Sequence, residues 1–461
     1  MKSPFSTITR KISLSSIIDC DTESGTLTDS HLFKGSIGII MLRVVSVGLA
    51  FIVSLILARL LGAKGYGIYA YSLAWIGFLN VPAILGFDRL LIRDISVCKT
   101  RSDWSLMRGL INFSHQAAMS STLIVVVAAI FINIRLRINS DPIFMHTFFF
   151  AMILIPLSVL IALKQSILKG LEKVVIGHVP EMLIKPSLLL VCLLLLYILG
   201  FKKNLSPSMA IAITIFASII SLFVVYIILK KELPSEIQET SPAYNIKVWI
   251  KSALPLSLIG GMLVINSQTD IIMLGAIKGP KDAGIYSIAN AFSSLITFVL
   301  ISVNASLAPS IASLYTSKNI LKLQHKITIS ARLILCLSLP IGIIIILFGK
   351  VLLSIYGADF VVGLSSLRIL CIGQLVNALA GSVGLLLIMT GYERRAAIGI
   401  GIGAISNIIL NAVFVPLLGM EGAAIASAVS MILWNIVLAI EVNKHIGIHP
   451  TALGQLYLLN K

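Results

Sequence analysis

The amino-acid sequence predicts an all-α integral membrane protein with twelve transmembrane helices. Hydrophobic residues make up 57% of the 461 residues and charged residues only 12%, whereas a soluble domain carries roughly 25% charged residues. The apolar residues gather into runs of about 20, the length of helix that crosses the hydrocarbon core of a bilayer. The sequence lacks the period-two alternation of an outer-membrane barrel, so we expect the runs to form helices.

The twelve runs follow one another along nearly the whole chain, separated by short polar or glycine-containing connections. Each is long enough for one passage of the membrane. In chain order they lie at 35–60, 67–92, 108–132, 143–168, 175–199, 208–229, 247–275, 283–312, 327–348, 364–390, 396–418 and 422–443.

The basic residues predict the orientation of these spans. The two terminal segments and the even-numbered connections together hold 23 Lys and Arg, and the odd-numbered connections hold nine. Cytoplasmic loops carry the excess of Lys and Arg. We therefore expect both termini on the cytoplasmic side of the cell (inner) membrane. The net charge of +17 fits this topology and anionic headgroups better than nucleic acid.

The chain also repeats itself at an offset of 213 to 221 residues. Six helices per half would place both halves in the same orientation, related by a pseudo-twofold axis along the membrane normal. The repeat divides the chain into a tail (1–34), a first lobe (35–229), a linker (230–246), a second lobe (247–445) and a second tail (446–461), with the linker and both tails cytoplasmic. The matching pairs are Leu61-Gly62-Ala63 with Leu274-Gly275-Ala276, Gly67-Ile68-Tyr69 with Gly284-Ile285-Tyr286, Gly170-Leu171-Glu172-Lys173 with Gly391-Tyr392-Glu393-Arg394, and Leu199-Gly200 with Leu418-Gly419.

Residues 57–70, LARLLGAKGYGIYA, resemble the first hairpin of polysaccharide-biosynthesis flippases, a family of the multidrug/oligosaccharidyl-lipid/polysaccharide exporter superfamily. Leu85-Gly86-Phe87-Asp88-Arg89 and the segment from Asp270 to Gly275 are similar to further patterns of that family. The resemblance covers about residues 35 to 443. The sequence departs from the family at Ile271, which stands where many members carry an Arg after the aspartate of the seventh span.

The resemblance implies a transporter rather than an enzyme. Its cargo would be a polyprenyl-pyrophosphate-linked oligosaccharide, moved from the inner to the outer leaflet by alternating access for surface polysaccharide or O-antigen (lipopolysaccharide) export. The implied partners are that lipid, the surrounding membrane lipids, a coupling cation (H⁺ or Na⁺) and polysaccharide-assembly proteins.

Three charged residues in the first lobe are candidates for the transport site, because ionisable groups inside spans are costly unless paired or hydrated. Arg43 would face the cavity and bind a pyrophosphate through its planar guanidinium, or extend to the cytoplasmic headgroups. Glu181 and Lys185 stand four apart in the fifth span, the spacing of an intrahelical ion pair. Contact with the cargo is the alternative for this pair, and Glu181 is also a candidate for binding a coupling cation or balancing a positive charge.

The second lobe contributes one acid and several amides. Asp270 ends the polar run Asn266-Ser267-Gln268-Thr269-Asp270 and would hold a coupling cation, balance an arginine, or lie near the outer headgroups. Asn290, Gln374 and Asn377 are candidates for sugar contact, although hydrogen bonds between helices explain such residues equally well. Gly399, Gly401 and Gly403 indicate close helix packing.

Several other chemistries lack their sequence signatures. The chain has no GxxxxGK[ST] loop, no HExxH and no CxxC, so we expect no nucleotide hydrolysis, cofactor or metal centre. A cation-coupled multidrug extruder on the same scaffold would need acidic cavity residues, whereas the spans hold more basic than acidic residues. A membrane enzyme of polysaccharide assembly would need a sizeable outer loop, and the longest predicted one has about ten residues.

Overall fold

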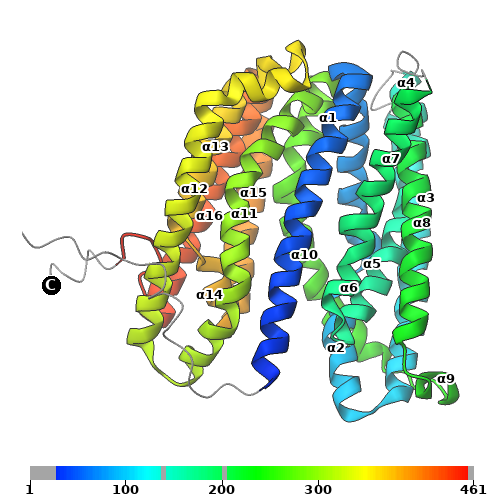
Figure 1. Ribbon diagram of the computed structural model, residues 1–461, viewed down its shortest axis with the longest axis vertical. Coiled ribbons are helices and arrows are strands. Elements are labelled where there is room, and N and C mark those ends of the chain that lie inside the picture. Colours follow the sequence, from blue (N-terminus) through cyan, green and yellow to red (C-terminus); the bar gives the residue numbers. More distant parts are fainter. Residues whose placement is uncertain (1–26, 137–141, 200–204, 455–461) are drawn as a thin grey trace, which may run out of the picture.

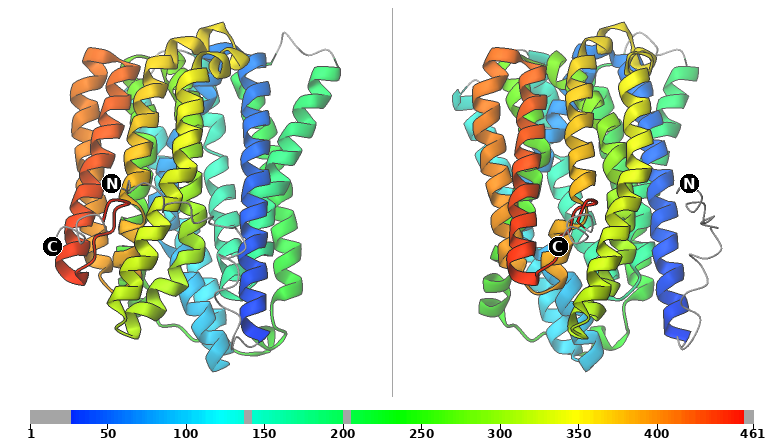
Figure 2. Two further views of the ribbon diagram at one scale, coloured as in Figure 1. Left: turned by 60° about the vertical axis from the view of Figure 1, so that its left-hand side comes forward. Right: turned by 90° about the vertical axis from the view of Figure 1, so that its left-hand side faces the viewer.

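The computed structural model describes residues 27–136, 142–199 and 205–454, and the regular structure of these residues is entirely helical (Figure 1). The long helices run side by side along the long axis of the molecule, as the three views of Figures 1 and 2 show. The elements are α1 (Leu27–Ile84), α2 (Phe87–Arg101), α3 (Trp104–Leu136), α4 (Pro142–Ala151), α5 (Leu154–Gly170), α6 (Val174–Val179), the π-helix η2 (Pro180–Ile184), α7 (Lys185–Ile198), α8 (Pro207–Glu232), α9 (Glu236–Glu239), α10 (Ile246–Ile277), α11 (Pro280–Thr316), α12 (Ile320–Tyr356), the 3₁₀-helix η4 (Ala358–Gly363), α13 (Leu364–Ala380), α14 (Val383–Met389), α15 (Glu393–Leu418) and α16 (Met420–Ile446).

Twelve passages of the chain are long and apolar enough to cross a membrane. Within the described residues, eleven segments meet the length and hydropathy of a span, and one of them, Met41–Ile84, has 44 residues. This segment folds back on itself at Gly62, whose φ of 67° lies in the region that favours glycine. The fold class predicted from the sequence, twelve spans in two six-helix lobes, is confirmed.

Four of the predicted spans contain a break in the regular α-helix. Leu85 and Gly86, both at positive φ, separate α1 from α2. The fourth and tenth spans are divided into α4–α5 and α13–α14. The fifth contains η2, where the Lys185 amide donates to the Pro180 carbonyl five residues back. The Ser221 hydroxyl donates to the same oxygen at 2.9 Å, which stabilises this wider turn.

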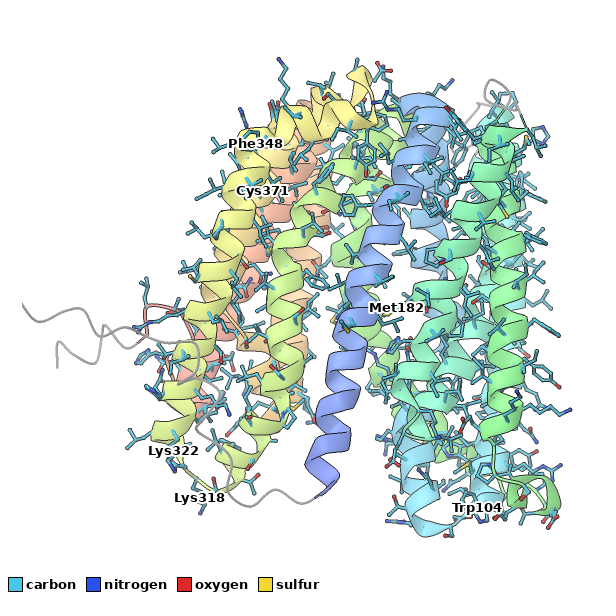
Figure 3. The ribbon with its side chains drawn as sticks, viewed as in Figure 1. Trp104, Met182, Lys318, Lys322, Phe348 and Cys371 are labelled. Carbon is cyan, nitrogen blue, oxygen red and sulfur yellow. The ribbon has the colours of Figure 1, made fainter. Side chains whose placement is uncertain are left out.

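The two lobes meet along α1, α10 and α11. The N lobe comprises α1 to α8, and the C lobe comprises α10 to α16. We name the two ends of the bundle after Gly62 and Lys318; Figure 3 labels Lys318 at the lower end. At the Gly62 end, a Cβ on Gly284 would lie 2.5 Å from the Cα of Gly67. These two glycines match in the sequence repeat, and they touch, as residues close to a pseudo-twofold axis do.

The chain after α16 folds back into the C lobe. Gln324 of α12 brackets the backbone of His449, accepting from its amide at 2.8 Å and donating to its carbonyl at 2.9 Å. The Ala452 amide donates to the Leu379 carbonyl beside the α13–α14 break, and Arg332 donates to the Ala452 carbonyl at 3.1 Å. The described part of the predicted tail, up to Gly454, is therefore packed against helices; its cytoplasmic location remains a prediction.

Candidate functional site

A polar cavity of about 400 Å³ lies between the first limb of α1 (27–61) and the C lobe. Five of the seven candidate residues from the sequence line it. They come from four helices far apart in the chain: Arg43 from α1, Asp270 from α10, Asn290 from α11, and Gln374 and Asn377 from α13. We call this space the C-lobe cavity.

Arg43 forms the α1 side of this cavity. Its side chain is half-buried, and Val47, one helical turn further on, lines the same wall. Gly62 follows 19 residues later, about 28 Å along the helix, so Arg43 lies toward the Lys318 end. The described ion pairs include none with Arg43. Its guanidinium is placed to meet an anion that enters the cavity.

The opposite wall carries side-chain amides held by their oxygens. Thr297 of α11 donates a hydrogen bond to Oε1 of Gln374. Asn435 of α16 donates to Oδ1 of Asn377 at 2.9 Å. Both contacts use the amide oxygen, and no bond described for these residues uses the Gln374 or Asn377 amide nitrogen. The two NH₂ groups therefore remain as donors for a molecule in the cavity.

Asp270, which also lines the cavity, is the centre of a buried polar cluster and is only 4% exposed. The Tyr286 hydroxyl donates to Oδ2 at 2.8 Å, and the Ser427 hydroxyl donates to the same oxygen. Asn411 and Asn407 of α15 donate to Oδ1 at 2.7 and 3.1 Å. Four helices, α10, α11, α15 and α16, thus converge on one carboxylate.

The partners of Asp270 are all neutral. The described salt bridges join it to no arginine or lysine, so the counter-charge role considered from the sequence has no partner in the described chain. The Asn407 and Asn411 amide oxygens are buried without a hydrogen-bond partner. The carboxylate and the two hydroxyl oxygens beside it are hard ligands of the kind that Na⁺ or Ca²⁺ prefers, whereas the two asparagines turn their NH₂ groups toward the carboxylate. Desolvation makes a proton the other means of neutralising it.

Glu181 and Lys185 lie apart from this cavity. Lys185 lines a cavity of about 310 Å³ in the N lobe with Ser54 and Tyr66, and Glu181 borders both this cavity and a third one of about 320 Å³ between the lobes. The two charges are electrostatic neighbours, but no direct ion pair joins them among the described residues. The π-helical turn η2 lies between the two residues, and their pairing stays a prediction. Figure 3 labels Met182 of η2 near mid-height.

Sequence reasoning identified Asp270 but none of its four hydrogen-bond partners as site residues. Tyr286 appeared only as part of a repeat motif, and Asn407, Asn411 and Ser427 were not singled out. Asn407 and Asn411 stand four apart in an otherwise apolar run, so they share a helix face. That spacing was the available signal, and only the packing of α15 on α10 reveals its partner.

The fold and the polar interior define a multi-pass membrane protein with a polar cavity between helices of its two lobes, the arrangement of a transporter. The pattern of the family described as "Polysaccharide biosynthesis protein" matches residues 32–315, and that of the MatE family matches 255–413. The chain belongs to the polysaccharide biosynthesis protein family. The resemblance found in the hairpin motif is thereby confirmed, as is the multi-pass membrane character of the chain.

Two sequence relatives and two solved structures extend this assignment. The probable flippase AglR of Haloferax volcanii is 29% identical over 180 residues, 37% of this chain and 36% of AglR. The chain thus matches just over a third of that relative's length. The uncharacterized membrane protein MJ1375 of Methanocaldococcus jannaschii is 26% identical over 306 residues, 63% of this chain and 70% of that protein.

The structural relatives share the fold at low sequence identity. An inward-facing multidrug resistance transporter of the MATE family superposes with a TM-score of 0.70 at 15% identity, covering 87% of this chain and 94% of that one. The inward closed form of the lipid II flippase MurJ gives 0.65 at 17% identity, covering 88% and 87%. These relatives are transporters and flippases rather than enzymes.

Proposed function

We propose that this protein is a flippase that moves a polyprenyl-pyrophosphate-linked oligosaccharide from the inner to the outer leaflet by alternating access. The observation that carries the proposal is the C-lobe cavity, with one guanidinium on the α1 wall and neutral amides on the other. A pyrophosphate needs the first, since arginine binds phosphate oxygens in a bidentate fashion and stays charged. The hydroxyls of a sugar need the second.

The contacts between the lobes support an inward-facing state. Arg59, Ser54 and Tyr66 of the N lobe contact Ile355, Tyr356 and Phe360 of the C lobe, all at the Gly62 end. With both termini in the cytoplasm, as the basic residues predict, this closed end faces outward. Arg43 then stands in the inner half of the membrane, where a cargo from the inner leaflet would first be held.

The cation-coupling part of the proposal rests on Asp270. Release of an anionic cargo outward and return of the empty carrier require a driving force, and the chain has no nucleotide-binding loop. A buried carboxylate in the wall of the same cavity, with two unpartnered amide oxygens on neighbouring side chains, offers a site for Na⁺ or H⁺. Cation occupancy would bias the two-state equilibrium by its differential affinity for each state.

A reconstituted assay tests this function. The full-length protein is placed in vesicles whose inner leaflet alone contains an undecaprenyl-pyrophosphate-linked disaccharide. A membrane-impermeant glycosyltransferase, added outside, modifies only the lipid that has crossed. Protein-dependent modification is expected, with protein-free vesicles as the control. Efflux of an organic cation without any lipid crossing would overturn the proposal in favour of a multidrug extruder.

A further inference from the structure

The C-lobe cavity also contains an aromatic surface. Trp434 of α16 lines the cavity close to Gln374 and Asn377, the residues with free amide nitrogens. Its indole is half-buried. Tryptophan offers a large rigid apolar face, and a pyranose ring has an apolar face of C–H groups whose hydroxyls project at its edge. Ligand sites commonly pair such an apolar wall with a few placed polar groups.

A glycine on the neighbouring helix fixes the position of this indole. A Cβ on Gly403 of α15 would lie 2.8 Å from Cε3 and 3.0 Å from Cβ of Trp434. The indole therefore rests directly on the α15 backbone, and no larger residue than glycine fits behind it without moving the ring. The Gly399-Gly401-Gly403 series does serve packing, but at Gly403 the packed group also faces the cavity.

The amides beside the indole are fixed as well. Asn435, the residue after Trp434, donates to Asn377 and to its own helix at the Met431 carbonyl. This ties the orientation of the Asn377 amide to the turn of α16 that carries the indole. Thr297 holds Gln374 in the same manner from α11. An apolar face and two fixed donors are thus held together by four helices, α11, α13, α15 and α16.

We propose that Trp434, with Gln374 and Asn377, forms the subsite for the first sugar of the cargo, and that Trp434 discriminates a glycosylated lipid from the bare lipid pyrophosphate. The inference rests on the proposed function and deepens it. Arg43 binds the pyrophosphate present in both lipids, whereas the indole face contacts only the sugar. The cavity volume of about 400 Å³ lies within the roughly 300–1,000 Å³ of small-ligand sites.

The test compares the binding of two lipids by the purified full-length protein in nanodiscs. The probes are undecaprenyl pyrophosphate and the same lipid carrying one N-acetylglucosamine, and Kd is measured by calorimetry. We expect the wild type to bind the glycosylated lipid more tightly. Trp434→Leu should raise the Kd of the glycosylated lipid about tenfold and leave the Kd of the bare lipid within twofold of the wild-type value. Trp434→Phe, which keeps an aromatic face, should recover most of the preference.

Gly403→Ala displaces the indole without altering it and should act like Trp434→Leu. Gly399→Ala is the matched control, because its Cβ meets Leu438 of α16 at 2.5 Å, a comparable clash outside the lining of the cavity. The sugar subsite would be overturned if Trp434→Leu lost affinity equally for both lipids, or lost affinity for neither. A wild type that binds both lipids equally would also overturn it while leaving the flippase proposal intact. Binding of neither lipid by the wild type would overturn both.

Discussion

The Arg59 guanidinium holds the last turn of α12 through Ile355, whose carbonyl oxygen accepts from Nε at 2.6 Å. A second guanidinium nitrogen lies 3.4 Å from the Ser354 carbonyl. The last carbonyls of a helix have no partner within it and carry a partial negative charge. Arg59 therefore satisfies groups of the C lobe from a position in the N lobe, and the contact exists only while the Gly62 end is closed.

Replacing Arg59 should open that end. In Arg59→Gln we expect a several-fold larger population of the open state, since a charge-assisted hydrogen bond at an exposed position contributes about 1 kcal/mol. Spin labels at Lys64 and Lys350, on the two lobes, would report it as a longer distance by electron-electron double resonance. Arg93→Gln is the control, because Arg93 pairs with Asp94 of its own helix. Identical distance distributions in the two variants would show that the contact of Arg59 with the end of α12 does not hold the Gly62 end closed.

Asp270→Asn should remove cation dependence without unfolding the protein. Asparagine keeps the shape of the side chain and one acceptor oxygen, and it removes a buried charge that has no charged partner among the described residues. The hydroxyls of Tyr286 and Ser427 can rotate to accept a hydrogen bond from the new amide nitrogen. A cation that binds the folded state alone stabilises it by about 2.7 kcal/mol at one hundred times its Kd. We expect Na⁺, exchanged for choline at constant ionic strength, to raise the Tm of the wild type and not that of Asp270→Asn.

Asp282→Asn, at the start of α11, is the control for general charge effects. A Na⁺ response that survives Asp270→Asn would place the cation elsewhere. If Na⁺ leaves the wild type unchanged while transport depends on pH, and that dependence disappears in Asp270→Asn, then the proton is the coupling ion.

Arg43→Ala should abolish transport at normal expression, and Arg43→Lys should retain part of it. The guanidinium makes two parallel bonds to a pyrophosphate and lysine offers only a point charge. We expect Arg43→Ala to lose about 1.5–3 kcal/mol of binding free energy for the pyrophosphate, the value of a hydrogen bond to a charged group. The measure is the initial rate of lipid crossing in vesicles with equal protein content. A wild-type rate in Arg43→Ala would make the residue an anchor to the headgroups.

The number and order of the helices could be predicted from the sequence, because the length and hydropathy of each span are visible in a continuous stretch of residues. The sequence repeat also located the contact between the lobes, since Gly67 and Gly284 match in the repeat and touch in the structure. With the offset of 213 residues, Leu57 takes the place of Asp270 in the N lobe. The buried carboxylate is therefore peculiar to the C lobe, and the two lobes have diverged at the candidate cation site.

Backbone irregularity and packing between distant helices could not be predicted from the sequence. The expected pairing of Glu181 with Lys185 assumes an α-helical turn, whereas Pro180 starts a π-helical one. Asn411 lies 141 positions from Asp270, and no local spacing connects them. Both facts depend on how helices pack, which hydropathy alone does not encode.

The topology can be tested on the two ends of α11. Single cysteines at Lys278 and Lys318, in a background without native cysteines, lie just before and just after this helix, and both positions are exposed. In sealed cells we expect a membrane-impermeant maleimide to label position 278 and to leave 318 unlabelled until the membrane is opened. The reverse pattern would invert the orientation and with it the direction of transport.

Gly67→Ala should prevent the Gly62 end from closing. A Cβ at this position would lie 1.8 Å from the Pro280 carbonyl oxygen and 2.5 Å from its carbon. Both are backbone atoms of the other lobe, so no side-chain rotation relieves the clash. Alanine is itself the best helix former, so the N lobe should fold normally and the lobes should separate at this end.

Transport should then stop, because alternating access requires both ends to close in turn. A cysteine at Ser54, which lines the N-lobe cavity, should become several times more reactive toward an impermeant maleimide added outside. Gly48→Ala serves as the control, since a Cβ there meets nothing within 4 Å. If Gly67→Ala transports at the wild-type rate with unchanged Ser54→Cys reactivity, then closure at the Gly62 end does not depend on the close approach of Gly67 to α11.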